Sequence, residues 1–197
     1  TQPALRDYED SPLGGRRIVK KKRAIPPLST VEVTDEAAAG GNQSLRITEQ
    51  PGLEHGFEPY ITYMLDQEDG LLELGLDLRC DEGGPFVFEC RDDPHAYSLG
   101  PQLTVDAEGW LSANGERLLQ LPRGEWARLD IACILGEEST GTYDLTVTTA
   151  GDAPREFNDL AHAEGFSTLA CVVIMSTGDD DARFYIDNLT FQREEAP

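Results

Sequence analysis

Short runs of alternating apolar and polar residues follow one another along most of the chain, separated by Gly, Asn, Asp and Pro. A period of two is the pattern of a β-strand with one buried face. It predicts strands near residues 29–34, 43–48, 59–66, 71–80, 85–92, 96–105, 109–112, 117–120, 125–135, 141–149, 168–176 and 183–192. Only residues 36–41 and 157–166 carry a pattern that suits a turn or two of helix.

Many short strands with turn residues between them are typical of a sandwich or jelly roll. We therefore expect an all-β fold, a two-sheet antiparallel jelly-roll β-sandwich. A length of 197 residues suits a single domain. We expect residues 1–197 to form that one domain, with residues 1–28 as an extended N-terminal segment that joins the sandwich.

Three antiparallel pairings can be predicted from turn residues. The stretch 102–122 contains AEG and ANG, and Asn-Gly is a strong hairpin turn. The stretches 125–135 and 141–149 flank the loop GEEST and form another pair. The third prediction is a hairpin between 71–80 and 86–92, in which Cys80 lies opposite Phe86 and the apolar faces match.

The opposite face of that third hairpin would gather charged residues in one place. These are Glu73, Asp77, Arg79, Glu89 and Arg91, with His95 and Tyr97 in the next loop. Carboxylates and arginines on a concave sheet face can hold sugar hydroxyls through paired hydrogen bonds, and an arginine can hold a uronate or sulfate. The alternative is an ordinary solvated face with cross-strand ion pairs.

Charge narrows the range of partners. The chain has 37 acidic residues against 16 basic ones, a net charge of −21, and six of the basic residues lie in the run RRIVKKKR at 16–23. So acidic a surface repels nucleic acid and anionic membranes, and we expect neither as a partner. It also argues against a broadly anionic polymer, unless the arginines create a local positive patch.

Motifs for catalysis or for zinc are missing from the sequence. The four cysteines form no CxxC pair, which predicts buried free thiols. The three histidines fall in expected loops without HExxH spacing, and GxSxG and GxGxxG do not occur. Jelly-roll glucanases carry ExDxxE, whereas GLLELGLD provides Glu73 and Asp77 at another spacing. Jelly-roll lyases carry a strand arginine, a Gln-x-His and a late tyrosine motif; ECRDD provides an arginine, but no Gln-x-His follows.

Several small motifs resemble known modules. GEWARLDIACILGEESTGTYDLTVTTAG and FSTLACVVIMSTGDDDARFYIDNLTF, with the earlier YEDSPLGG, GGNQSLRITEQPG, ECRDD and YSLGPQL, resemble concanavalin A-like (laminin-G-like) jelly-roll modules over most of residues 7–192. Such modules are appended to secreted bacterial proteins, many of which act on polysaccharides. The resemblance therefore implies a secreted or cell-surface/periplasmic setting.

The string FYIDNLTF, residues 184–191, raises a separate question, because Asp and Asn are poor strand residues. The pair could bind a metal, face a ligand or mark a bend. Galactose-binding-like carbohydrate-binding modules have a similar start and finish, and there an early acid and a late Asp meet at a structural calcium. This resemblance implies a site at Glu9, Asp10 and Asp187, with Asn188 nearby. Otherwise Asp187 would bond loop backbone amides.

Taken together, these patterns favour a non-catalytic carbohydrate-binding or accessory module that holds a polysaccharide or oligosaccharide on a concave sheet face. Aromatic candidates for stacking on sugar rings are Tyr60, Tyr63, Tyr97, Trp110 and Trp126. One alternative is a structural or interaction domain that docks a neighbouring catalytic domain of a larger protein. A jelly-roll glycoside hydrolase or polysaccharide lyase is another. Fold kinship alone decides none of these.

Overall fold

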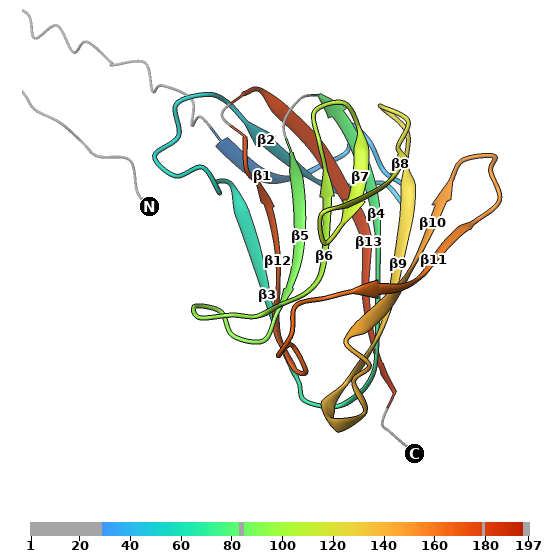
Figure 1. Cartoon of the computed structure of the whole chain (residues 1–197). Coiled ribbons are helices and arrows are strands. Elements are labelled where there is room, and N and C mark those ends of the chain that lie inside the picture. Colours follow the sequence, from blue (N-terminus) through green and yellow to red (C-terminus); the bar gives the residue numbers. More distant parts are fainter. Residues whose placement is uncertain (1–28, 83–84, 179, 195–197) are drawn as a thin grey trace, which may run out of the picture.

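The computed structural model describes residues 29–82, 85–178 and 180–194 (Figure 1). The predicted extended segment 1–28 lies outside the described residues. The strands are β1 (Ser29–Thr34), β2 (Ser44–Glu49), β3 (Tyr60–Gln67), β4 (Gly70–Glu82), β5 (Phe86–Arg91), β6 (Leu99–Val105), β7 (Trp110–Ala113), β8 (Glu116–Gln120), β9 (Ala127–Leu135), β10 (Thr142–Thr149), β11 (Arg155–Ala161), β12 (Leu169–Ser176) and β13 (Ala182–Glu194).

These strands form two antiparallel sheets that face each other. The seven-stranded sheet has the order β1-β2-β13-β4-β9-β10-β11, and the six-stranded sheet has the order β3-β12-β5-β6-β7-β8. Figure 1 shows the two layers, with β3, β12 and β5 to the left of the long strands β4 and β13. The prediction of an all-β jelly-roll sandwich is confirmed.

The two expected helical segments were wrong. Residues 155–161 form β11, an edge strand that pairs with β10, and residues 36–41 form bends and turns. The described residues contain one short 3₁₀ turn, Gly136–Glu138, in the loop between β9 and β10. An edge strand has only one neighbour and little to bury, so β11 shows only a weak apolar alternation.

The core lies between the sheets and follows the alternation of the sequence. On β4, the residues Leu72, Leu74, Leu76 and Leu78 are buried, and on β5 the inward side chains are Phe86, Phe88 and Cys90. Phe86 meets Phe184 of β13 edge-on, with ring centroids 5.3 Å apart, which joins the two sheets.

The predicted hairpin between 71–80 and 86–92 does not form. β4 pairs with β13 and β9, whereas β5 pairs with β12 and β6 in the other sheet. Both strands put an apolar face toward the same core, so matching faces cannot distinguish a hairpin from a connection that crosses between sheets. The other two predictions hold, since β6, β7 and β8 form a meander and β9 pairs with β10.

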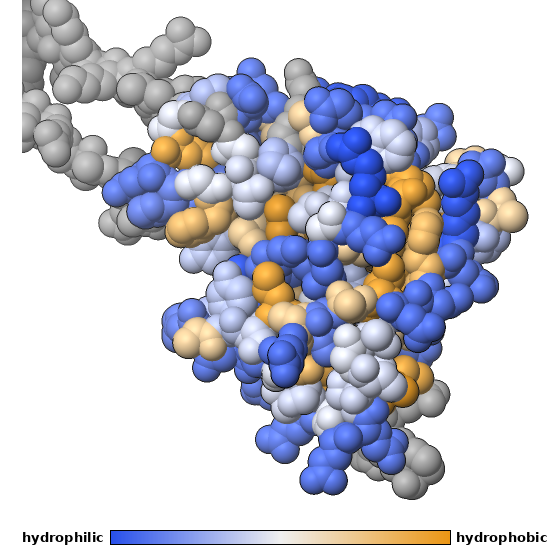
Figure 2. All heavy atoms as spheres, in the orientation of Figure 1, coloured by the Kyte–Doolittle hydropathy of each residue, from blue (hydrophilic) through white to orange (hydrophobic). Residues whose placement is uncertain are grey.

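Polar residues cover most of the surface seen in Figure 2, with an apolar strip between the β7–β8 hairpin and β10–β11. Leu119, Leu121, Pro122 and Val147 line a hollow there. The cysteines are free: Cys90, Cys133 and Cys171 are buried and Cys80 is half-buried. No helix in the described ranges has the length and apolar character needed to cross a membrane.

Candidate functional site

The structure divides the predicted groove between two surfaces. We call the outward side of the six-stranded sheet the six-stranded face, and that of the other sheet the seven-stranded face. Glu73, Asp77 and Arg79 of β4 lie on the seven-stranded face, because the leucines between them point into the core. Glu89 and Arg91 of β5 lie on the six-stranded face. The prediction of one shared groove was therefore wrong.

On the seven-stranded face an arginine crosses over a glycine. Arg128 of β9 lies above Gly75 of β4 and donates from Nη1 to the Asn188 carbonyl at 2.9 Å and from Nη2 to Thr190 Oγ1 at 3.1 Å. Its Nε donates to Asp130 Oδ1 at 2.8 Å. Asn188 Nδ2 donates to Asp77 Oδ2 at 2.6 Å. This face carries a closed polar network between three strands.

The Asp-Asn pair of β13 marks a β-bulge. The register between β13 and β4 shifts between Asp187 and Thr190, and Asn188 has a positive φ of 46°, a conformation that Asn tolerates well. Asp187 Oδ2 accepts from the backbone amides of Ala39 and Gly40 at 2.9 and 3.0 Å, and Oδ1 accepts from that of Asn188 at 2.7 Å. The pair thus anchors a loop 147 residues away in sequence.

The predicted calcium site stays a prediction. Its partners Glu9 and Asp10 lie outside the described residues. Within the part of the chain that the structure describes, no group of three or more His, Cys, Asp or Glu side chains is arranged to hold a metal ion.

The six-stranded face has a buried ion pair at its centre. Arg91 donates from Nε at 2.9 Å and from Nη2 at 2.5 Å to Glu89 Oε2. The side chains of Arg91 and Glu89 are only 14% and 8% exposed. Gln102, opposite Glu89 on β6, donates from Nε2 to Glu89 Oε1 at 2.8 Å. Both oxygens of this carboxylate are therefore occupied.

A short loop after β5 places an aromatic ring on that pair. The Tyr97 ring lies over the guanidinium of Arg91, with Cζ 3.9 Å from the ring centroid. Asp93 Oδ1 accepts from the amides of Ala96 and His95, and these hydrogen bonds lower the pKa of Asp93. Ser98 N donates to Asp92 at 2.6 Å. The loop is thus held by its own hydrogen bonds, with His95 exposed beside Tyr97.

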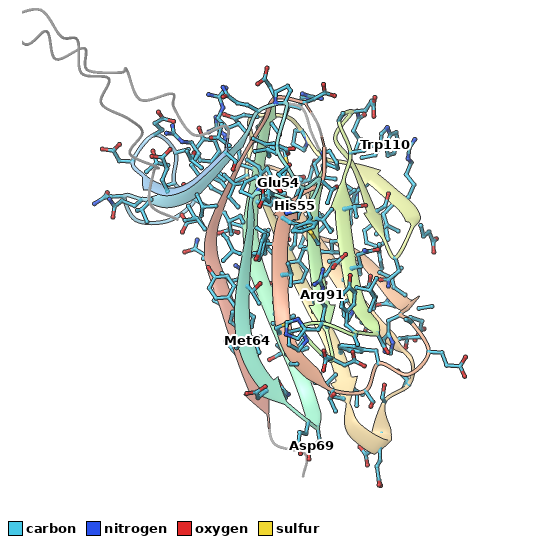
Figure 3. All side chains as sticks on the ribbon, turned by 90° about the vertical axis from the view of Figure 1, so that its left-hand side faces the viewer. Glu54, His55, Met64, Asp69, Arg91 and Trp110 are labelled. Carbon is cyan, nitrogen blue, oxygen red and sulfur yellow. The ribbon has the colours of Figure 1, made fainter. Side chains whose placement is uncertain are left out.

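A second set of exposed rings lies along β3 and the loop before it. Tyr60 and Met64 point outward from β3, and Phe57 projects from the loop; they are 53%, 58% and 48% exposed. Phe57 stacks on His55 with centroids 5.2 Å apart and meets Tyr60 at 5.9 Å. Figure 3 looks onto this face, with Arg91 near the centre, His55 toward one end and Met64 on the outer strand.

Between these two sets the strands β12 and β5 form an apolar floor. Val87, Cys171, Val173 and Met175 are buried although they point away from the main core. In Figure 1 the loops 50–59 and 92–98 both project from the side of the sheet that Figure 3 shows. The six-stranded face thus has a buried apolar and ion-paired centre with exposed rings on two sides.

The aromatic candidates sort by face. Tyr60, Tyr97 and Trp110 belong to the six-stranded face, where Arg117 lies over the Trp110 ring at 4.9 Å. Tyr63 points inward and packs against the core. Trp126 meets Tyr185 of β13 edge-on and so belongs to the other sheet. Sequence reasoning missed Phe57 and Met64; the alternation of 60–66 would have found Met64 once Tyr60 was placed outward.

Comparison with known proteins supports the fold. No protein-family model matches the chain, and no curated protein matches it either. Among solved structures, an endo-β-1,4-glucuronan lyase from the fungus Trichoderma reesei is similar with a TM-score of 0.58 and 11% identity, covering 86% of this chain and 89% of that chain.

Two further structures are similar. An alginate lyase from Aplysia kurodai has a TM-score of 0.58 and 10% identity, covering 83% of this chain and 87% of that one. The cellulose-induced protein Cip1 has a TM-score of 0.52 and 12% identity, covering 83% and 85%. At such identities the likeness shows a shared jelly-roll fold. Membership of the concanavalin A-like family stays a prediction.

Proposed function

We propose that this protein is a non-catalytic module that binds a polysaccharide along the six-stranded face. The observation that carries the proposal is the set of exposed rings on this face, Phe57 and Tyr60 on one side and Tyr97 on the other, around a buried centre of apolar residues and the Arg91–Glu89 ion pair. The fold is shared with two polysaccharide lyases, and this adds weight to a carbohydrate ligand.

The chemistry of a sugar chain suits this surface. The apolar face of a pyranose ring stacks on a tyrosine or phenylalanine ring, and its hydroxyls need donors and acceptors around the edge. Thr62 and Thr104 offer hydroxyls on the same face as Tyr60 and Gln102. Because strands and a hydrogen-bonded loop hold these side chains, little order has to be gained on binding.

The same face has exposed His95, Tyr60 and Tyr97 as possible bases, but its described strands offer lyase chemistry no unpaired arginine. Removing the proton next to a sugar carboxylate requires a base within hydrogen-bond reach and a free group to neutralise the carboxylate. Arg91 is already paired with Glu89, and the residue two positions after Gln102 is Thr104, a hydroxyl rather than the imidazole of Gln-x-His. Glu89 likewise has both oxygens occupied, which counts against a role as a glycosidase carboxylate.

Binding can be tested by isothermal titration calorimetry against a panel of soluble polysaccharides. We expect Tyr60→Ala and Tyr97→Ala each to weaken binding by roughly two- to tenfold, if stacking of a sugar on a ring contributes about as much as stacking of two aromatic rings, roughly 0.5–1.5 kcal/mol beyond area burial. Ile134→Ala is the matched control, since Ile134 is an exposed apolar residue of β9 on the seven-stranded face. Equal effects of all three substitutions would refute this location of the site.

Catalysis is tested with the same panel. Incubation with each polysaccharide should produce neither unsaturated sugar ends, measured by absorbance near 235 nm, nor new reducing ends. Turnover that depends on Arg91 would favour the lyase alternative. Retained binding without turnover supports the module.

A docking domain is the second candidate, and one observation favours it. Val31 and Val33 of the edge strand β1 are 41% and 65% exposed. They point to the inner side of the seven-stranded sheet, the side on which their β2 partners Ile47 and Leu45 pack in or against the core. If no polysaccharide binds, Val31→Thr and Val33→Thr would be the first variants to test for loss of contact with a neighbouring domain.

A further inference from the structure

The ion pair at the centre of the six-stranded face has a consequence for the choice of ligand. We infer that the protein takes an uncharged polysaccharide, and that Glu89 is the residue that excludes polyuronates and other anionic glycans. This inference rests on the proposed binding face. It names the chemical class of the ligand and a residue that determines it.

Arg91 is already paired within the protein. A free strand arginine would be the natural partner for a sugar carboxylate, because its planar fork binds carboxylates through two parallel hydrogen bonds. Here Nε and Nη2, the side edge of the guanidinium, are both directed at Glu89 Oε2, and the Tyr97 ring covers a flat side of the guanidinium. The end edge, formed by Nη1 and the second hydrogen of Nη2, makes no hydrogen bond with another described residue, so Glu89 acts on a ligand there through its charge.

Glu89 places a negative charge beside Arg91. Its carboxylate is buried, two residues from Arg91 on the same strand, and Gln102 holds its other oxygen. An anionic sugar that approached Arg91 would also meet this negative charge, which lies 2.9 and 2.5 Å from Nε and Nη2 of the guanidinium. Attraction and repulsion would largely cancel, while the sugar carboxylate would still lose its hydration.

The rest of the six-stranded face adds no unpaired positive charge from its described strands. Arg117, the other arginine that points outward from its described strands, is paired with Asp106 at 3.0 Å and lies on the Trp110 ring. Asp66 of β3 and Asp92 beyond β5 add negative charge. The whole chain carries a net charge of −21, which disfavours the approach of a polyanion at low salt. The local positive patch that an anionic glycan would need is not formed by the described residues of this face.

The exposed side chains fit an uncharged sugar instead. The large apolar side chains exposed on this face are Phe57, Tyr60, Met64 and Tyr97, none of which carries a charge. Rings and a thioether contact the C–H face of a sugar regardless of its hydroxyl pattern, whereas neutral hydroxyls can bond to threonine and glutamine at the edges. The face therefore offers uncharged rings to a sugar, while Glu89 balances the charge of its most buried arginine, Arg91.

The test compares two sets of probes in the calorimeter at 50 mM and 300 mM NaCl. The neutral set is mixed-linkage β-glucan, xyloglucan and galactomannan, and the anionic set is alginate, polygalacturonate and polyglucuronate. Wild-type protein should bind at least one neutral probe at least tenfold more tightly than every anionic probe, at both salt concentrations.

Two variants test the role of Glu89. Glu89→Gln keeps the shape but frees the charge of Arg91, and it should raise the ratio of anionic to neutral affinity at least tenfold, in a salt-sensitive manner. The double variant Glu89→Gln with Arg91→Gln removes both charges and should return the ratio to the wild-type value. It also controls for a folding defect caused by an unpaired buried arginine.

The outcomes separate the two proposals. Wild-type binding to an anionic probe as tight as to any neutral probe would overturn the inference but leave the binding module intact. An unchanged ratio in folded Glu89→Gln would refute the role of Glu89. Binding to no probe at all would overturn the proposed function itself. If Glu89→Gln does not fold, the wild-type ratio still decides the ligand class, and the double variant decides whether neutral binding needs the charges.

Discussion

Replacing Gly75 by alanine tests the polar network of the seven-stranded face. Gly75 has an ordinary backbone conformation, so alanine itself would fit the strand. A Cβ at this position, however, would lie 1.9 Å from Nη2 and 2.7 Å from Cζ of Arg128. The guanidinium would have to move off β4 and give up its hydrogen bonds to β13. We therefore expect Gly75→Ala to destabilise the protein.

The magnitude follows from the bonds that are lost. Arg128 makes two hydrogen bonds to β13, at 2.9 and 3.1 Å. Each contributes about 0.5–1.5 kcal/mol, so the loss is about 1–3 kcal/mol. Relief of a glycine within a strand offsets about 0.5–1 kcal/mol. The net cost should be about 0.5–2 kcal/mol, or roughly 1–8 °C in Tm for a domain of this size.

A double-mutant cycle measures the coupling between Gly75 and Arg128 directly. In an Arg128→Ala background the nearest obstacle is gone, and Asp130, whose Oδ1 would lie 2.7 Å from the new Cβ, has lost the arginine that holds it and can turn away. Gly75→Ala should then become neutral or stabilising, and the two backgrounds should differ by about 1–3 kcal/mol. Equilibrium unfolding in urea, followed by circular dichroism, gives each free energy. Gly56→Ala is the control, because a Cβ there meets nothing within 4 Å. Equal costs of Gly75→Ala in both backgrounds would refute the arginine crossing.

Three shorter predictions concern the bulge and the thiols. Asp187→Ala should cost about 2–4 kcal/mol in urea unfolding, since three amide hydrogen bonds end on this carboxylate, whereas Asp35→Asn, an exposed acid, should cost little. If the predicted calcium site forms, a chelator lowers the Tm and calcium restores it; an unchanged Tm with a cost for Asp187→Ala would leave anchoring as the role of Asp187. Burial raises the pKa of Cys80 and of Cys133 to about 12, so only about one thiol in 10⁴ at either position is ionised at pH 8. Neither cysteine should react with Ellman's reagent until the protein unfolds, and fast labelling of the native protein would contradict this.

Strand positions could be predicted from the sequence because each strand buries one face. The alternation in 71–80 reappears as the buried leucines of β4, and the turns at AEG and ANG connect β6, β7 and β8. The edge strand β11 was missed because residues 155–161 bury little apolar surface. Local patterning thus reports burial, and it fails where a strand is held mainly by backbone hydrogen bonds.

The pairing of strands was harder to predict than their positions. β4 and β5 are neighbours in sequence and share one core, yet they belong to opposite sheets. Consequently Glu73, Asp77 and Arg79 were grouped with residues from which the whole sandwich separates them. Of the candidate site, Glu89, Arg91, His95 and Tyr97 do lie together, because they belong to one strand and the loop that follows it. Their role in binding a carbohydrate stays a prediction.

The pairing of strand arginines with acids two positions away could have been predicted from the sequence alone. Two residues apart on a strand, side chains point to the same side about 6–7 Å from each other, within reach of an arginine and a carboxylate. Arg79 bonds Asp81, Arg91 bonds Glu89 and Arg128 bonds Asp130, each at this spacing. Such local pairing neutralises an arginine before the fold brings any distant residue near it. An acid two positions from a strand arginine therefore reduces the charge that the arginine offers to an anion, and the Glu89–Arg91 pair is the case on which the proposed preference for a neutral ligand rests.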